Sequence, residues 1–247
     1  MKKSISTKDT AGHVKGPSGR REREKPSKED KGLAIFDLDG TLLDTRADLA
    51  AALNRTRKRL GLAPVSQETV VRAVGNGVRR LIERTIPEEE SPLPLEEKIA
   101  IQSEEYMDGL FDATIPYPGV DETLRALKAA GWKLAVLSNK PDPATKSLMA
   151  HFGWDALFDV VQGGAPSIPL KPDPASVDFI IRATGYRGPR ERVWMVGDNY
   201  TDLEAGRRAG TRRCFCRYGI GKSNGETADF EVDGILVWTR HVLSAED

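Results

Sequence analysis

The sequence predicts an α/β protein with an open, doubly wound parallel sheet and an inserted helical cap. Short runs of aliphatic and β-branched residues alternate with longer stretches whose apolar residues recur at helical spacing. Most short runs end in Gly, Ser, Asn or Asp, as expected of parallel strands that are buried on both faces. One interval between two strands is much longer than a βα crossover requires, and this length predicts the insertion.

The sheet is expected to form from five strands, at residues 33–36, 133–137, 158–161, 193–196 and 211–216. Four helices are expected, several with a Gly directly after them, at residues 120–130, 143–152, 174–184 and 201–209. Strands that alternate with helices pair in parallel, so their carboxyl ends meet along one edge of the sheet. Residues 32–45 and 116–247 are therefore assigned to a Rossmann-like catalytic core.

The insertion lies between residue 37 and the strand near residue 134, an interval of nearly a hundred residues. Apolar residues follow helical spacing in three stretches of it: Leu49, Leu53 and Leu60; Val78, Leu81 and Ile82; and Ile99, Tyr106 and Leu110. We expect a helical cap over residues 46–115, joined to the core by hinges near residues 45–47 and 115–119.

Residues 1–31 are expected to be a disordered basic tail. They contain no aromatic residue and no Leu, so they cannot bury enough apolar surface to become ordered. Ten basic and five acidic residues give this stretch a net charge of about +5. It lacks the apolar segment of a secretory signal, so the cytoplasm is the predicted location.

Composition excludes several classes of function. Lys plus Arg and Asp plus Glu both number 37, so the chain lacks the strong positive field of a dedicated nucleic-acid binder. The apolar runs are too short to span a bilayer, so no membrane partner is expected. Cys214 and Cys216 have neither redox nor zinc spacing and are expected to be buried thiols, while the three His residues are scattered. The chemistry is therefore sought among carboxylates.

Polar residues are concentrated where four segments reach the predicted sheet edge. These segments are residues 37–41 (Asp-Leu-Asp-Gly-Thr), 138–140 (Ser-Asn-Lys), 171–174 (Lys-Pro-Asp-Pro) and 197–202 (Gly-Asp-Asn-Tyr-Thr-Asp). In an open α/β sheet the ligand binds beyond the carboxyl ends of the strands. At least four carboxylates, an ammonium and a hydroxyl are therefore expected to meet at one place.

This set of groups suits phosphoryl transfer. Clustered carboxylates stay ionised most easily beside a cation, and Mg²⁺ prefers hard oxygen ligands while leaving room for a substrate phosphate. A carboxylate next to that ion is a competent nucleophile toward phosphorus, and a second carboxyl two residues away can protonate the leaving alcohol. A hydroxyl and an ammonium stabilise charge on the phosphoryl oxygens.

The same residues match, in order, the four motifs of the haloacid dehalogenase superfamily of phosphohydrolases, and the resemblance covers about residues 33–240. The motifs are Asp37-Leu38-Asp39-Gly40-Thr41, Ser138, Lys171, and Gly197-Asp198 with Asp202. Residues 74–78 and 81–84 in the cap, and residues 117–120 at its exit, resemble the phosphoglycolate phosphatase branch, which has a helical cap after the first motif.

The resemblance implies a role for each motif residue. Asp37 would be the nucleophile, Asp39 the general acid/base, and Mg²⁺ would bind Asp37, the Asp39 backbone carbonyl and Asp198. Ser138 and Lys171 would hold the transferring phosphoryl group, with Lys171 also neutralising Asp37.

Five further residues surround this set. Thr41 is expected to orient the first loop, and Thr41 and Asn139 are assigned to substrate binding. The resemblance implies that Asp202 supports Asp198 or the metal's waters, and both a capping or supporting role and direct ligation of the metal are open. The Gly75-x-Gly77 segment follows no strand and lacks a third Gly, so it is not a dinucleotide fingerprint and is expected to open a helix. Gly77 and Arg79 would then face the leaving group, unless the segment is an ordinary turn with exposed arginines.

The predicted function is a magnesium-dependent phosphatase that hydrolyses a small phosphate monoester, 2-phosphoglycolate, through an aspartyl-phosphate. Its partner would be a small phosphorylated metabolite. A sugar-phosphate mutase or a pyrophosphatase of the same superfamily would share the core motifs and differ in the cap. A phosphate-binding protein without catalytic activity would be expected to have lost a core carboxylate, and none is lost here. None of these patterns indicates the oligomeric state.

Overall fold

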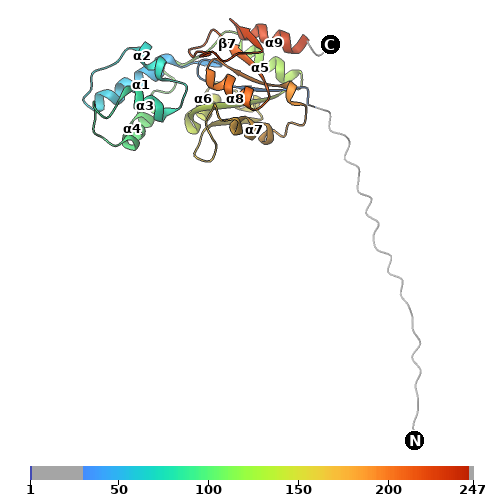
Figure 1. The fold of residues 1–247 in the computed structure, drawn as a ribbon, viewed down its shortest axis with the longest axis horizontal. Helices are drawn as coiled ribbons and strands as arrows, with labels where there is room; N and C mark the ends of the chain where they lie inside the picture. The colour runs from blue at the N-terminus through green and yellow to red at the C-terminus, as the bar shows by residue number, and fades with distance from the viewer. Residues whose placement is uncertain (2–29, 245–247) are drawn as a thin grey trace.

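A six-stranded parallel sheet forms the centre of the protein in the computed structural model, which describes Met1 and residues 30–244 (Figure 1). The expected basic tail therefore lies almost wholly outside the described residues. The strand order is β5-β4-β1-β6-β7-β8, and every neighbouring pair is parallel. The strands are β1 (Leu33–Phe36), β4 (Lys133–Pro141), β5 (Val160–Gly164), β6 (Val193–Gly197), β7 (Arg212–Cys216) and β8 (Phe230–Val232).

Helices cover both faces of this sheet because alternate residues of each buried strand point to opposite sides. Ala34 and Phe36 of β1 belong to the same apolar cluster as residues of α5 and α9, whereas Leu33 and Ile35 pack in a second cluster with residues of α7 and α8. The helices of the core are α5 (Val120–Ala129), α6 (Asp142–His151), α7 (Pro174–Ala183), α8 (Tyr200–Arg208) and α9 (Ile235–Ser244). Two short 3₁₀ turns, η1 (Asp155–Leu157) and η2 (Arg190–Arg192), complete the connections.

Four helices form the insertion between β1 and β4, and Figure 1 shows them in blue to green as a group beside the sheet. They are α1 (Arg46–Arg59), α2 (Gln67–Ala73), α3 (Val78–Thr85) and α4 (Leu95–Asp108). An antiparallel pair of short strands, β2 (Leu43–Asp44) and β3 (Ile115–Pro116), lies where the chain enters and leaves them. The predicted fold class is confirmed, while the exact cap boundaries stay a prediction.

The structure differs from the sequence prediction in several elements. Strand β4 runs to Pro141, beyond its predicted end at residue 137. The third core strand, β5, begins at Val160 and not at residue 158, because Phe158 directly follows η1 and packs edge-on against Phe36, with ring centroids 6.4 Å apart. Helix α2 lies in the cap between two of the predicted helical stretches. At the C-terminal side, β8 and α9 extend the sheet and cover one of its faces.

An aromatic cluster anchors α9 to the sheet. Trp238 is fully buried and meets Phe36, Trp132 and Trp194 edge-on at centroid distances of 5.7, 6.4 and 5.9 Å. Such edge-to-face pairs add to the apolar burial of the rings. The expectation for Cys214 and Cys216 is confirmed, since both are buried free thiols on β7. Among the described residues, no helix has the length and apolar character needed to cross a membrane.

Replacing Trp238 by Ala is expected to lower the free energy of unfolding by about 3–5 kcal/mol, because it leaves a cavity among three rings. Urea denaturation of the purified chain measures this loss. Val237→Ala is the matched control, since Val237 is the preceding residue of α9 and is 52% exposed. Equal effects of the two substitutions would show that the aromatic cluster does not anchor the helix.

Candidate active site

The polar segments expected at the sheet edge do converge there. β1 lies between β4 and β6, so the carboxyl ends of these three strands are adjacent. Asp37 directly follows β1, and its backbone N–H donates to the Val196 carbonyl of β6 at 2.9 Å. Ser138 lies in the last part of β4, and Asp198 follows β6. After β1 the strands are added first on one side of it (β4 and β5) and then on the other side (β6, β7 and β8). Open α/β sheets bind ligands at the point where the strand order reverses in this way.

Three buried carboxylates surround one buried ammonium. Oxygens of Asp37, Asp198 and Asp202 lie within 4.8 Å of one another. Lys171 Nζ lies 2.9 Å from Asp37 Oδ1 and 2.7 Å from Asp202 Oδ1. Burial lowers the pKa of Lys171, but Asp202 and Asp37 outweigh it and raise this pKa, so the ammonium stays charged. With all four groups ionised, the cluster carries two more negative charges than positive ones.

The Asp198 carboxylate is held by a ring of short contacts. Thr41 Oγ1 donates to its Oδ1 at 3.0 Å, and the backbone N–H groups of Ile220 and Gly221 both donate to its Oδ2 at 2.8 Å. Gly40, at φ +85°, lets the first loop approach so closely that a Cβ there would overlap this carboxylate. Burial, together with the charge of Asp37, raises the pKa of Asp198 to about 7.

Asp202 caps a helix and also pairs with Lys171. Its Oδ2 accepts a hydrogen bond from the Asn199 N–H at 3.0 Å and so caps helix α8, while its Oδ1 accepts from Lys171. Burial raises the pKa of Asp202. Because the carboxylate is fully buried within the cluster, Asp202 also belongs to the group that could hold a metal ion.

This cluster fits a divalent cation. Its donors are hard carboxylate oxygens, and its two excess negative charges match the charge of such an ion. Two of the expected ligands, Asp37 and Asp198, lie in it. The third expected ligand is the backbone carbonyl of Asp39, and the side chain of Asp39 is engaged elsewhere.

The Asp39 carboxylate forms a buried ion pair that the sequence did not predict. Lys140 Nζ donates to Asp39 Oδ1 at 2.8 Å and to Oδ2 at 3.0 Å, and Thr45 Oγ1 donates to Oδ1 at 2.8 Å. Burial lowers the pKa of Lys140, but the Asp39 charge outweighs it and raises this pKa, so Lys140 is a cation. Its ammonium lies 4.4 Å from the ring centroid of Tyr106. The only sequence signal for Lys140 was its place next to Ser138 and Asn139.

Ser138 and Asn139 lie beside the carboxylates. The Ser138 hydroxyl accepts from the Lys140 N–H at 3.3 Å and lines the cavity in front of Asp37. Asn139 Nδ2 donates to the carbonyls of Gly75 and Lys171, both at 2.9 Å, and Asn139 Oδ1 accepts from the Lys171 N–H at 2.8 Å. The side chain of Asn139 therefore positions Lys171 and ties the cap to the core.

The Gly75–Gly77 segment opens a helix, as expected: Gly77 is the N-cap of α3 and lines the cavity. Arg79 does not line the cavity, which favours the alternative of a helix start with exposed arginines. Arg79 is exposed and pairs with Glu96 of α4, and Arg80 pairs with Glu83 at 2.6 Å. Within the first turn of α3 these two side chains are exposed, whereas Gly77, Val78 and Leu81 line the cavity. Thr41 also does not line the cavity, because it is fully buried and contacts Asp198.

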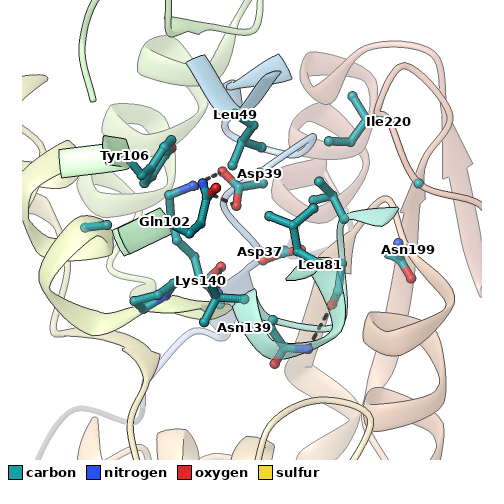
Figure 2. Close-up of a pocket in the computed structure, with 18 of the residues that line it drawn as sticks. Asp37, Asp39, Leu49, Leu81, Gln102, Tyr106, Asn139, Lys140, Asn199 and Ile220 are labelled. Carbon is teal, nitrogen blue, oxygen red and sulfur yellow. Dashed lines mark hydrogen bonds and ion pairs between the residues drawn. The ribbon is translucent and has the colours of Figure 1, made fainter. Parts of the chain in front are cut away.

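A cavity of about 240 Å³ lies between the carboxylates and the cap. Figure 2 shows Asp37 and Asp39 on its core side, with Leu49, Leu81, Gln102 and Tyr106 of the cap around it. Apart from the motif residues, its lining is largely apolar. The space is suited to a small organic group attached to a phosphoryl group at Asp37.

Comparison with known proteins agrees with this geometry. Residues 34–216 match the haloacid dehalogenase-like hydrolase family. The chain belongs to the haloacid dehalogenase-like hydrolases. It is 36% identical over 213 residues to a phosphoglycolate phosphatase of Aquifex aeolicus, covering 85% of this chain and 97% of that protein. It is 38% identical over 199 residues to a phosphoglycolate phosphatase of Psychrobacter arcticus, covering 77% and 85%.

A solved structure shows the same fold as this hydrolase. The crystal structure of a predicted phosphoglycolate phosphatase from Haemophilus somnus aligns with a TM-score of 0.77 at 29% identity, covering 87% of this chain and 98% of that one. The chain is thus a phosphoglycolate phosphatase-like phosphoric monoester hydrolase, and its substrate is a small phosphorylated molecule.

Removing the exposed arginines of this hydrolase is expected to change its activity little. Arg79→Ala and Arg80→Ala each break a surface ion pair, which contributes at most about 1 kcal/mol to stability. Steady-state kinetics with 2-phosphoglycolate and with p-nitrophenyl phosphate should give kcat/KM within about threefold of the parent chain, which corresponds to less than 1 kcal/mol. A large loss of kcat/KM for 2-phosphoglycolate alone would show that these arginines take part in substrate binding.

Binding of Mg²⁺ to this hydrolase is expected to weaken as the pH falls from 8 to 6. The pKa of Asp198 is about 7, so the carboxylate is mostly ionised at pH 8, and at pH 6 the metal must displace a proton. This competition weakens binding roughly tenfold. The shift of Tm with Mg²⁺ concentration measures it, with Asp198→Asn as the control that loses most of the shift. Equal Mg²⁺ midpoints at both pH values would contradict the assignment of Asp198.

Proposed function

We propose that this hydrolase is a Mg²⁺-dependent phosphatase that converts 2-phosphoglycolate to glycolate and phosphate through phospho-Asp37. The observation that carries the proposal is the position of Asp37. It lines the core side of a cavity, pairs with Lys171 at 2.9 Å and adjoins the buried Asp198 and Asp202 carboxylates. Support for the substrate comes from the two phosphoglycolate phosphatases that are 36% and 38% identical to the chain.

Asp37 is oriented for attack on phosphorus. Its Oδ1 accepts from the Leu38 N–H at 2.7 Å and faces Lys171, whereas Oδ2 accepts no hydrogen bond from residues 30–244. The free oxygen can form the bond to phosphorus as the ester bond breaks. Lys171 and the Ser138 hydroxyl then stabilise the charge on the phosphoryl oxygens. Bound Mg²⁺ would supply further charge neutralisation at Asp37, Asp198 and the phosphoryl group.

Asp39 is the group that handles protons. In the first step a proton passes from the Asp39 carboxyl to the oxygen of the departing alcohol. In the second step the Asp39 carboxylate takes a proton from water as the water oxygen attacks phospho-Asp37. The P–O bond to Asp37 breaks, phosphate leaves, and both carboxylates return to their starting states. Lys140 and Thr45 hold Asp39 at the cavity wall between these steps.

A cytoplasmic location remains part of this proposal, and the free thiols of Cys214 and Cys216 suit a reducing compartment. A panel of substrates separates the alternatives, since a mutase requires a sugar phosphate and a pyrophosphatase requires pyrophosphate. Phosphate release from 2-phosphoglycolate, glucose 1-phosphate and pyrophosphate, with Mg²⁺ and with EDTA, tests the proposal. Faster hydrolysis of either alternative substrate would overturn the substrate assignment.

Asp37→Asn is expected to lower kcat by about a thousandfold or more, because an amide is a poor nucleophile toward phosphorus. Asp39→Asn is expected to lower kcat by about 10²–10⁴-fold, the range of general acid–base catalysis. The two variants differ in Mg²⁺ binding: Asp39→Asn keeps the shift of Tm with Mg²⁺, because the proposed ligand is its backbone carbonyl. Near-normal turnover by Asp37→Asn would rule out the phospho-Asp37 route.

A further inference from the structure

One cation and one unpaired hydroxyl lie on the wall of the cavity away from Asp37. Among the described residues that line the cavity, Lys140 is the single cationic side chain. Lys140 Nζ donates to both oxygens of Asp39, and an ammonium has three N–H groups, so a further acceptor at this wall can be bound. The cap residues around the cavity include the apolar Leu49, Leu81 and Met107, while the polar Gln102 and Ser103 carry no charge.

The hydroxyl belongs to Tyr106 of α4. This side chain is 94% buried and lines the cavity, and its Oη has no hydrogen bond of acceptable geometry with any described residue. A buried hydroxyl that lacks a partner is costly, so its presence calls for an acceptor that arrives with a ligand. Figure 2 shows Tyr106 beside Lys140 and Asp39, on the cap side of the cavity.

The position of Tyr106 and Lys140 relative to Asp39 decides which part of a substrate these two side chains contact. The oxygen of the departing alcohol must lie within hydrogen-bond distance of Asp39 to receive its proton. Lys140 Nζ is 2.8 Å from that carboxylate, and Tyr106 packs against Lys140. Groups attached close to the ester oxygen therefore reach Lys140 and Tyr106, whereas the phosphoryl group stays at Asp37 and Lys171.

We propose that Tyr106 and Lys140 form an anion-binding subsite for the leaving group, which selects phosphate esters whose alcohol carries a carboxylate near the ester oxygen. The Tyr106 hydroxyl donates one hydrogen bond to this carboxylate and the Lys140 ammonium donates a second, charge-assisted one. This inference rests on the proposed phosphatase activity. It places the recognition of the organic part of the substrate at α4, which carries Tyr106, and at β4, which carries Lys140. In glycolate a single methylene separates the carboxylate from the ester oxygen, so it fits this placement.

The test compares an anionic ester with a neutral one of similar size. We expect Tyr106→Phe to lower the ratio of kcat/KM for 2-phosphoglycolate to kcat/KM for ethyl phosphate about tenfold or more, the effect of losing a hydrogen bond to a charged group. The substitution keeps the ring over Lys140 and removes only Oη. The Ki of glycolate as an inhibitor of p-nitrophenyl phosphate hydrolysis should rise by a similar factor.

Tyr117→Phe is the matched control. Tyr117 Oη is also buried without a hydrogen-bond partner among the described residues, but Tyr117 does not line the cavity. Its removal should leave the substrate ratio unchanged. Since neither hydroxyl has a hydrogen-bond partner among residues 30–244, neither substitution should lower Tm, and this separates recognition from a structural role.

The outcomes distinguish the subsite from the proposed function. Equal losses on both esters in Tyr106→Phe, or a fall in Tm with no change in ratio, would overturn the subsite while leaving the phosphatase in place. The parent chain could prefer another carboxylated ester, such as 2-phospholactate, over 2-phosphoglycolate. If Tyr106→Phe then lowers the ratio of kcat/KM for that ester to kcat/KM for ethyl phosphate, the result would correct the substrate and support the subsite. Faster turnover of ethyl phosphate or phosphoethanolamine than of any carboxylated ester by the parent chain would also overturn it.

Discussion

The arrangement of the site depends on how three carboxylates are kept together away from water. Asp37, Asp198 and Asp202 would repel one another, and Lys171 between two of them compensates only part of the charge. The surrounding chain reduces the repulsion further through fixed dipoles, with N–H groups and a hydroxyl directed at Asp198. Such groups need close backbone approach, so the loops after β1 and β6 contain small residues at the points of contact, Gly40 among them. The site is therefore prepared for a cation before one binds.

Sheet topology explains why residues so distant in sequence can meet in this way. β1 lies inside the sheet, with β4 on one side and β6 on the other, so one edge receives the segments that follow three strands. Lys171 comes from the connection between β5 and α7 and is held through its backbone by Asn139 of β4. The insertion after β1 then covers this edge with helices. In the proposed function the core handles the phosphoryl group, and the cap meets the organic group that is attached to it.

Most of the core was predictable from the sequence, because buried parallel strands and their helices have strong apolar patterns and the motif residues follow them directly. The position of the Arg79 side chain was not predictable, because the sequence places Arg79 near a helix start without showing which side of that helix faces the cavity. Lys140 and Tyr106 were missed for a related reason. Tyr106 fits the apolar pattern of a cap helix, and Lys140 approaches it only when the cap folds over β4. The apolar pattern of a helix or strand predicts that element by itself, and it does not show which side chains of two distant elements come into contact.

The side chain of Asn139 connects the two parts of the protein, since one amide nitrogen donates both to Gly75 of the cap and to Lys171 of the core. Separation of cap and core would break the first bond and the nearby bond from Asn76 Nδ2 to Tyr200 Oη, which is 2.8 Å long. Two hydrogen bonds contribute about 1 kcal/mol each, so these contacts alone would disfavour an open form by a factor of roughly 10–100. An open population of a few per cent is enough for substrate to enter and product to leave on every cycle. By linkage, a ligand that orders the Lys171 loop also favours the closed form.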